Sequence, residues 1–178
     1  MTVSHLFTST RLGFRLWQDS DLPSFSAMNA DEETMHYFKK PLSEEESKAM
    51  MERMNKLYAD RGYCYFAVES LETREFIGMI GIGWKTFEAD FTPCVDIGWR
   101  LDKRFWNQGF ASEGAIRVLD YAKEMGIKEV YSYTSSSNKA SSRVMEKAGL
   151  VYLKDFDLED LKNTPRLNPC SLYSISFY

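Results

Sequence analysis

The sequence predicts a single α+β domain (mixed α/β) arranged around one central sheet. Segments that alternate apolar and polar residues, as strands do, occur near both ends and in the middle of the chain, with helical segments between them. A strand at 94–101, a helix at 112–125 and a strand at 129–134 follow one another closely, which predicts two parallel strands and a right-handed crossover helix. The length of 178 residues suits one domain, 1–178, and neither a linker nor a repeat interrupts it.

The first part of the chain should contain one strand and a short helix. The stretch 11–17 alternates apolar and basic residues and therefore predicts a strand. The helix is expected within 19–31, where Asp21 has the position of an N-cap and Pro23 follows in the first turn.

A capping box marks the start of a second helix. Ser43 and Glu46 have the spacing at which each side chain satisfies a free backbone amide of the other residue. Gly62 is suited to end this helix. The strands expected at 63–70 and 75–84 are joined by a short polar segment, which predicts a hairpin.

The second half of the chain completes the predicted order. In the strand 94–101 the side chains alternate between two faces: Val95, Ile97, Trp99 and Leu101 on one, and Asp96, Gly98 and Arg100 on the other. Apolar residues at helical spacing run from Ser112 to Met125, and Gly126 is suited to end that helix. The remaining elements are a strand at 129–134, a helix at 138–150 ending at Gly149, and strands at 151–156 and 171–178.

Composition excludes several classes of protein. The net charge of -4 argues against a general nucleic-acid binder, which carries a basic excess. Three cysteines without paired spacing indicate neither a disulfide framework nor a zinc knuckle, and two histidines are too few for a histidine-rich metal site. We find no secretory signal and no apolar run of about 18 residues, so we expect a cytoplasmic protein that does not span a membrane. The cysteines, Cys64, Cys94 and Cys170, are expected to be buried strand thiols.

The stretch RFWNQGFASEGA at 104–115 joins a strand to a helix and allows two interpretations. The N-terminus of a helix leaves backbone N–H groups free and carries a partial positive charge. Small residues at Gly109 and Ala111 would let a pyrophosphate approach these amides, and Ser112 could cap the helix or donate a hydroxyl. The stretch also fits a plain turn, because it has neither a Walker loop nor a GxGxxG pattern.

A second segment favours the phosphate-binding interpretation. NKASSRVMEKAGL at 138–150 opens another helix, one strand later, with Asn138, Ser141 and Arg143. VDIGWRLDKRFWNQGFASEGA followed by this segment resembles the acetyl-CoA-binding core of the GNAT superfamily of N-acetyltransferases. The similarity is greatest to the branch that contains the ribosomal-protein N-terminal acetyltransferases.

The resemblance implies the GNAT fold, which is a mostly antiparallel central sheet with one parallel, splayed strand pair and flanking helices. It also implies a site for acetyl-CoA. The pyrophosphate motif of the family, Gln/Arg-x-x-Gly-x-Gly/Ala, falls on 106–111, where Trp106 replaces the usual Gln or Arg. The cofactor-binding residues implied are Gly98, Trp99, Arg100, Leu101, Arg104, Trp106, Asn107, Gln108, Gly109, Phe110, Ala111, Ser112, Asn138, Ser141 and Arg143.

By the same resemblance, a primary amine attacks the thioester of acetyl-CoA directly, without a metal. The amine belongs to a small molecule or to a protein N-terminus. A backbone N–H near Ile97 or Trp99 would polarise the thioester, and Asn138 would hold the pantetheine arm. Ser141 matches the serine that this branch places near the cofactor sulfur, so it is the candidate to assist the leaving thiolate; the alternative is a first-turn helix residue that bonds its own backbone. Met145 stands where many relatives carry a tyrosine as the acid.

Two questions stay open at this point. Asp96 is either the general base or a salt-bridged or solvent-facing strand residue, and Glu88 and Asp90 are alternatives that would attract a cationic acceptor. A non-catalytic coenzyme A-binding sensor or interaction module is the alternative function. We expect neither nucleic-acid nor membrane partners, and a homodimer is compatible with the resemblance because dimers are common in this branch.

Overall fold

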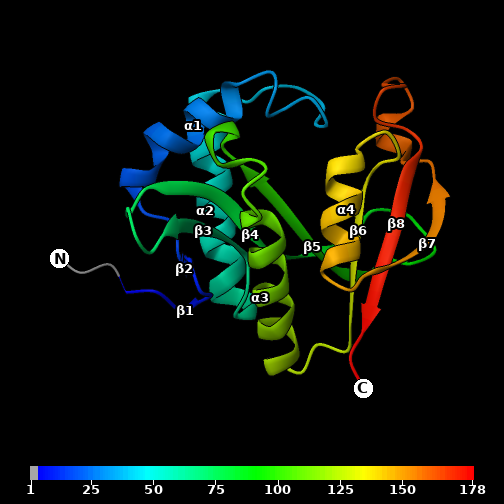
Figure 1. Ribbon diagram of the computed structural model, residues 1–178. Coiled ribbons are helices and arrows are strands. Elements are labelled where there is room, and N and C mark those ends of the chain that lie inside the picture. Colours follow the sequence, from blue (N-terminus) through cyan, green and yellow to red (C-terminus); the bar gives the residue numbers. More distant parts are fainter. Residues whose placement is uncertain (1–3) are drawn as a thin grey trace.

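One eight-stranded sheet organises the molecule, and helices cover both of its faces (Figure 1). The computed structural model describes residues 4–178. The strands are ordered β1-β2-β3-β4-β5-β6-β8-β7 across the sheet, and every neighbouring pair is antiparallel except β5 and β6. This order confirms the predicted sheet, mostly antiparallel with one parallel pair.

The elements agree with the predicted order, and most bounds differ by only a few residues. The strands are β1 (Phe7–Thr8), β2 (Leu12–Arg15), β3 (Tyr65–Ser70), β4 (Phe76–Lys85), β5 (Cys94–Leu101), β6 (Glu129–Ser135), β7 (Val151–Phe156) and β8 (Cys170–Ser176). The helices are α1 (Leu22–Ala30), α2 (Glu44–Arg61), α3 (Phe110–Glu124) and α4 (Lys139–Lys147). The sequence does not predict β1, because two residues are too few for a periodic pattern. Within residues 4–178, no helix has both the length and the apolar character needed to cross a membrane.

Hydrogen bonds at the helix starts confirm one expected cap and correct another. Ser43 Oγ accepts a hydrogen bond from the Glu46 amide at 3.2 Å, and a Glu46 carboxylate oxygen accepts one from the Ser43 amide at 2.8 Å. This is the predicted capping box of α2. Asp21 precedes α1 as expected, but its carboxylate does not bond the free amides of that helix. Two nitrogens of Arg15 and the Gln18 amide occupy it instead.

The helices pack on opposite faces of the sheet, so the core has two halves. Figure 1 shows α3 and α4 in front of the sheet and α2 behind it. On the α3 face, Phe66 of β3 packs edge-on against Tyr121, with ring centroids 5.7 Å apart. On the other face, Phe25 of α1 packs against Trp17 with centroids 4.3 Å apart. Protein therefore covers both faces of the sheet at these positions.

The parallel pair is joined over a very short length. β5 and β6 share a single bridge, between Asp96 and Tyr131, and they separate beyond it. Beyond this bridge each strand stays paired with its neighbour on the other side, β5 with β4 and β6 with β8. The result is the splayed pair that the resemblance implies, with a V that opens toward the C-terminal ends of both strands.

Candidate active site

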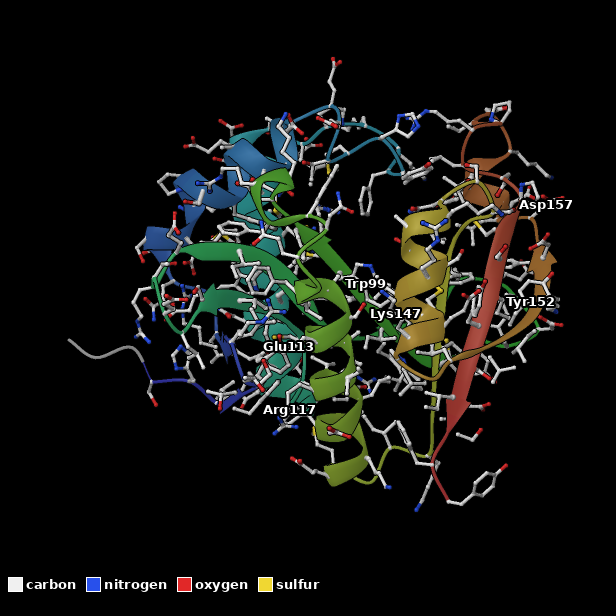
Figure 2. The ribbon with its side chains drawn as sticks, in the orientation of Figure 1. Trp99, Glu113, Arg117, Lys147, Tyr152 and Asp157 are labelled. Atoms are coloured by element: carbon white, nitrogen blue, oxygen red, sulfur yellow. The ribbon has the colours of Figure 1, made fainter. Side chains whose placement is uncertain are left out.

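A cleft of about 890 Å³ occupies the V between β5 and β6 and continues along the first turns of α3 and α4. Trp99 lies between these two helices (Figure 2). The cleft brings together most of the predicted site residues: Asp96, Gly98, Trp99, Arg100, Leu101, Trp106, Asn107, Gly109, Phe110, Ala111, Ser112, Asn138, Ser141 and Arg143.

Two predicted residues, Arg104 and Gln108, are not part of the cleft lining. The Arg104 guanidinium donates to Asp102 Oδ2 at 3.0 Å and is exposed to solvent. Gln108 Nε2 donates to the Arg104 carbonyl oxygen at 2.9 Å. These two side chains therefore hold the loop together and do not face the cleft.

The start of α3 presents free backbone amides to the cleft. The helix begins at Phe110 and not at Ser112 as predicted, because Gly109 is its N-cap in a left-handed conformation with φ of 81°. Asn107 is also left-handed, with φ of 58°, so the chain curls before the helix. The amides from Gly109 to Ser112 precede the first helical hydrogen bond, which Glu113 N donates to Gly109 O. A concave set of amides at a helix N-terminus is suited to bind an anion.

Arg11 anchors this loop from the start of the chain. Its Nε donates to Glu113 Oε2 at 2.6 Å, and its Nη1 donates to the Gln108 carbonyl oxygen at 3.0 Å. Burial raises the pKa of Glu113, but hydrogen bonds from Ser9 and Arg11 outweigh it and leave the pKa below its usual value. The sequence pattern indicates only a strand at Arg11, because its partner Glu113 lies 102 positions away.

Ile97 shows which backbone groups of β5 face the V. Its carbonyl oxygen accepts a hydrogen bond from Ser132 Oγ of β6 at 2.9 Å. Backbone direction alternates along a strand, so Trp99 and Leu101 point the same way, beyond the last bridge to β6. The Leu101 carbonyl already accepts from the Trp106 indole at 2.9 Å. The backbone N–H and C=O of Trp99 thus face the cleft, where an extended ligand could pair with them.

Asn138 organises the start of α4. Its Oδ1 accepts from the Ser141 amide at 3.2 Å and caps the helix. Its Nδ2 donates to Ser141 Oγ at 3.1 Å and to Thr134 Oγ1 at 3.0 Å, so both ends of the carboxamide are engaged within the protein. Among the described residues the Ser141 hydroxyl has no acceptor, which leaves its proton for a group in the cleft.

Asp96 is buried where the two strands part. Its Oδ1 accepts a hydrogen bond from the Tyr65 hydroxyl at 2.5 Å, and its Oδ2 lies 3.7 Å from Lys85 Nζ. Burial raises the pKa of Asp96 above its ordinary value, and the Lys85 charge and the Tyr65 hydrogen bond offset this only in part. Asp96 is thus ion-paired, as one interpretation expects, and it lines the cleft, as the role of base requires.

Two tyrosines that the sequence pattern does not single out also line the cleft. Tyr65 comes from β3 and Tyr133 from β6. Burial raises the pKa of both phenols, so both hydroxyls stay protonated at neutral pH. Met145 lines the cleft as well and is buried, and it offers no acidic proton there.

The remaining candidates lie elsewhere or are unreactive. Glu88 and Asp90 are exposed and outside the cleft lining, and Asp90 pairs with Lys154. Cys64, Cys94 and Cys170 are buried and free, as predicted. Burial raises the pKa of Cys94 and of Cys170 to about 11, so both stay protonated thiols at neutral pH.

A cleft between splayed parallel strands, beside a helix start with free amides, defines an acyltransferase of the GNAT type. The family model for the "Acetyltransferase (GNAT) domain" matches residues 11–151, and the chain belongs to this family.

Relatives and solved structures agree with this assignment. The chain is 27% identical over 147 residues to the uncharacterized N-acetyltransferase YoaA of Bacillus subtilis, which covers 81% of each protein. The crystal structure of a GNAT-family acetyltransferase from Bacillus anthracis has a TM-score of 0.76 at 25% identity, covering 95% of this chain and 96% of that one. RimL, a ribosomal L7/L12 α-N-protein acetyltransferase solved in complex with coenzyme A, has a TM-score of 0.78 at 18% identity over 98% of each chain. The predicted fold and family are confirmed.

Proposed function

We propose that this protein transfers the acetyl group of acetyl-CoA to a primary amine by direct attack of the amine on the thioester. The observation that carries the proposal is the continuity of one cleft, which runs from the free amides of 109–112 to the buried carboxylate of Asp96. The first end suits a pyrophosphate, and the second suits the deprotonation of an amine.

Coenzyme A would be held mainly by backbone groups. The amides of 109–112 would receive the pyrophosphate, and the Trp99 backbone carbonyl would accept a hydrogen bond from the pantetheine arm. Arg143 and Lys147 of α4 also line the cleft and add positive charge there. Coenzyme A bound to the structural neighbour RimL supports this choice of co-substrate.

The chemistry follows from the groups in the cleft. The protonated amine loses one proton to Asp96, whose raised pKa makes it a stronger base than an ordinary carboxylate, and Asp96 passes that proton to solvent. The neutral amine nitrogen then forms a bond to the thioester carbon while the carbon–sulfur bond breaks, and the nitrogen releases its extra proton to solvent as it becomes an amide. The Trp99 N–H donates to the carbonyl oxygen as negative charge develops there. The departing sulfur takes a proton from the Ser141 hydroxyl, which solvent replaces.

Release of free thiol from acetyl-CoA in the presence of a panel of primary amines and N-terminal peptides tests this function. We expect turnover above hydrolysis with at least one acceptor and binding of coenzyme A measurable by calorimetry. Binding of coenzyme A without turnover of any acceptor would identify the alternative, a non-catalytic coenzyme A-binding module.

A further inference from the structure

Arg100 is a buried cation without an anionic partner among residues 4–178. The residue lines the cleft, yet it is only 7% exposed. Nη1 donates to Asn29 Oδ1 at 2.6 Å, and the guanidinium carbon lies 3.9 Å from the centre of the Phe38 ring. Nε is buried and has no hydrogen-bond partner. Burial lowers the pKa of Arg100 to about 10, as expected for a charge that lacks a counter-charge.

The position of Arg100 is built by neutral groups from two helices. Asn29 of α1 is fixed in turn by a hydrogen bond from its Nδ2 to Ser47 Oγ of α2 at 3.0 Å, and both residues are fully buried. Arg166 donates to the Phe38 carbonyl at 3.1 Å and so holds the loop whose ring covers the guanidinium. These contacts orient the positive charge but do not neutralise it. Proteins rarely bury a charge in this way unless something pairs with it.

Arg100 lies on the face of β5 that is turned away from α3. Ile80 of β4 reaches Gly114 of α3, and Ile80 is the register partner of Trp99. Side chains alternate along a strand, so Arg100 and Asp96 project from the opposite face, toward α1 and α2. The amides that suit a pyrophosphate are at the start of α3, on the other side. The guanidinium therefore lies on the Asp96 side of the sheet, where the proposed function places the acceptor amine, and not beside the amides that suit the phosphates of the co-substrate.

We propose that Arg100 binds a carboxylate of the acceptor, so that the substrate of this acetyltransferase is a primary amine that also carries a carboxylate. The proposal rests on the proposed function. Nη1 is engaged by Asn29, and among residues 4–178 no hydrogen-bond partner occupies Nε or Nη2, which form the other edge of the guanidinium. That edge presents two parallel N–H donors, the arrangement that matches a carboxylate. Asp96 and Arg100 are roughly 13 Å apart along the strand, so an amine near one and a carboxylate near the other fit one small molecule or chain terminus.

Matched acceptors test the proposal. A series of amino acids whose amine lies progressively farther from the carboxylate, from the α position up to a chain long enough to span roughly 13 Å, would each be assayed beside the corresponding carboxamide and aminophosphonate, in the wild type and in Arg100→Gln and Arg100→Lys. We expect the wild type to prefer the carboxylate. In Arg100→Gln, kcat/KM for the carboxylate should fall roughly 10- to 100-fold through KM, the range expected for lost hydrogen bonds to a charged group. In the same variant, kcat/KM for the carboxamide should fall less than about threefold, and KM for acetyl-CoA should not change. Arg100→Lys keeps the positive charge but lacks the paired N–H donors. Its kcat/KM for the carboxylate should therefore lie between those of the wild type and of Arg100→Gln.

Lys39→Gln is the matched control for a general loss of positive charge at the cleft. Lys39 also lines the cleft, but it is exposed and already paired with Asp160 at 3.1 Å. We expect this variant to keep the wild-type preference for a carboxylate within about twofold. An equal loss in Lys39→Gln and Arg100→Gln would overturn the specific role of Arg100.

Other outcomes separate this inference from the proposed function. A wild type that acetylates carboxamides as well as carboxylates would overturn the inference and leave the acetyltransferase intact. A preference for the phosphonate would overturn the choice of carboxylate. If no amine is acetylated, the proposed function fails, and titration of the amino acids into protein saturated with coenzyme A decides the inference alone. Binding by the wild type and not by Arg100→Gln would support it, and no binding by either would overturn it.

Discussion

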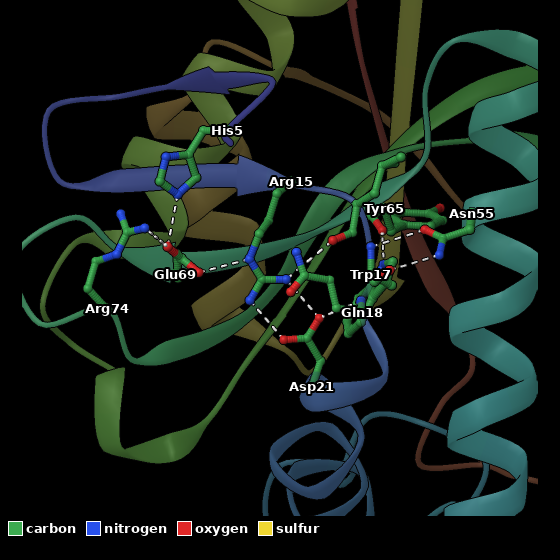
Figure 3. Close-up of polar contacts among 10 residues, drawn as sticks. His5, Arg15, Trp17, Gln18, Asp21, Asn55, Tyr65, Glu69 and Arg74 are labelled. Carbon is green, nitrogen blue, oxygen red and sulfur yellow. Dashed lines mark hydrogen bonds and ion pairs between the residues drawn. The ribbon is translucent and has the colours of Figure 1, made fainter. Parts of the chain in front are cut away.

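Two arginines of this protein are equally buried but have opposite surroundings. Arg15 of β2 is 6% exposed and donates to Asp21 from Nη1 and Nη2, at 2.7 Å and 2.8 Å, and to Glu69 from Nε at 2.8 Å (Figure 3). Arg100 of β5 is 7% exposed, and within residues 4–178 its side chain forms a hydrogen bond only with the neutral Asn29. Burial lowers the pKa of Arg15, but its two carboxylates outweigh this and raise the pKa overall. Burial acts unopposed on Arg100.

The difference in charge pairing distinguishes two parts of the protein. In the cluster around Arg15 every charge has a partner within the protein, whereas the cleft around Arg100 leaves groups that a ligand could pair with. Glu69 also bonds His5 at 2.9 Å and pairs with Arg74 at 3.3 Å, so the cluster around Arg15 satisfies its own charges (Figure 3). The cleft instead keeps groups without partners, namely the Arg100 guanidinium and the amides of 109–112. Unpaired polar groups lower stability, and they persist where binding uses them.

The largest expected contrast comes from the same substitution at the two arginines. Arg15→Met leaves two buried carboxylates without their cation and should lower the free energy of unfolding by about 3–5 kcal/mol. Arg100→Met removes a charge that has no anionic partner among residues 4–178 but leaves the buried Asn29 Oδ1 without its donor, so we expect a loss of at most about 1–3 kcal/mol, smaller than that of Arg15→Met. Urea denaturation of both variants measures the two effects on one scale.

Each arginine variant is the control for the other, since both remove one guanidinium from a buried strand position. Comparable losses of stability in the two variants would show that the surroundings of Arg100 are as complete as those of Arg15. That result would contradict our conclusion that the charges around Arg15 are paired within the protein while the charge of Arg100 is not.

Local patterns in the sequence predict most of the fold. Ser43 and Glu46 lie three residues apart, and the alternation in 94–101 is visible without any knowledge of distant parts of the chain. Gly109 marks the turn before α3 in the sequence. The sequence pattern does not predict its left-handed φ, with which the helix starts at Phe110 and not at Ser112.

The site is less predictable because long-range contacts build it. Arg100 meets Asn29 across 71 positions, and Tyr65 meets Asp96 across 31. A single sequence carries periodicity and short motifs but does not state which distant side chains meet. The backbone donors at 109–112 are therefore recognisable from sequence, whereas the pairing of Asp96 and the isolation of Arg100 are not.

Asp96 is intermediate between the two arginines, because it has partners yet burial still raises its pKa. As the base, it should give kcat/KM a limb that rises with pH through that raised pKa. Asp96→Asn should abolish the limb and lower kcat roughly 100-fold. Asp90→Asn removes an exposed carboxylate outside the cleft and should keep the limb. A pH–rate profile of Asp96→Asn that matches the wild type would remove Asp96 as the base.

The stability of Asp96→Asn should depend on pH in a defined direction. A carboxyl whose pKa is raised on folding binds its proton more tightly in the folded state. Its contribution to stability is therefore complete below its ordinary pKa of 3.8 and is lost as pH rises through the raised value. Above the raised pKa the wild type must hold an ionised buried carboxylate, so at those pH values Asp96→Asn should unfold at higher urea concentration than the wild type. This advantage should shrink as the pH is lowered toward 3.8.

Gly109→Glu tests the free amides at the start of α3. The substitution adds a charge where we place the pyrophosphate and should raise KM for acetyl-CoA roughly 10- to 100-fold, with little change in kcat. The left-handed φ of Gly109 also makes any side chain unfavourable by about 1–2 kcal/mol. Gly126→Glu is a close control, because Gly126 follows the other end of α3 with φ of 79° and open space around it. Equal KM values in the two variants would show that the amides of 109–112 do not bind the co-substrate.

The smallest expected effect is that of the Ser141 hydroxyl. A thiol with a pKa of about 8.5 leaves reasonably well unaided, so Ser141→Ala should lower kcat less than about tenfold and leave KM for acetyl-CoA in place. Ser142→Ala is the neighbouring control, because Ser142 Oγ donates to the Asn138 carbonyl at 3.3 Å and lies outside the cleft lining. An equal fall in kcat in both variants would assign the effect to the packing of the first turn of α4. A fall confined to Ser141→Ala would assign it to the hydroxyl that Asn138 holds toward the cleft.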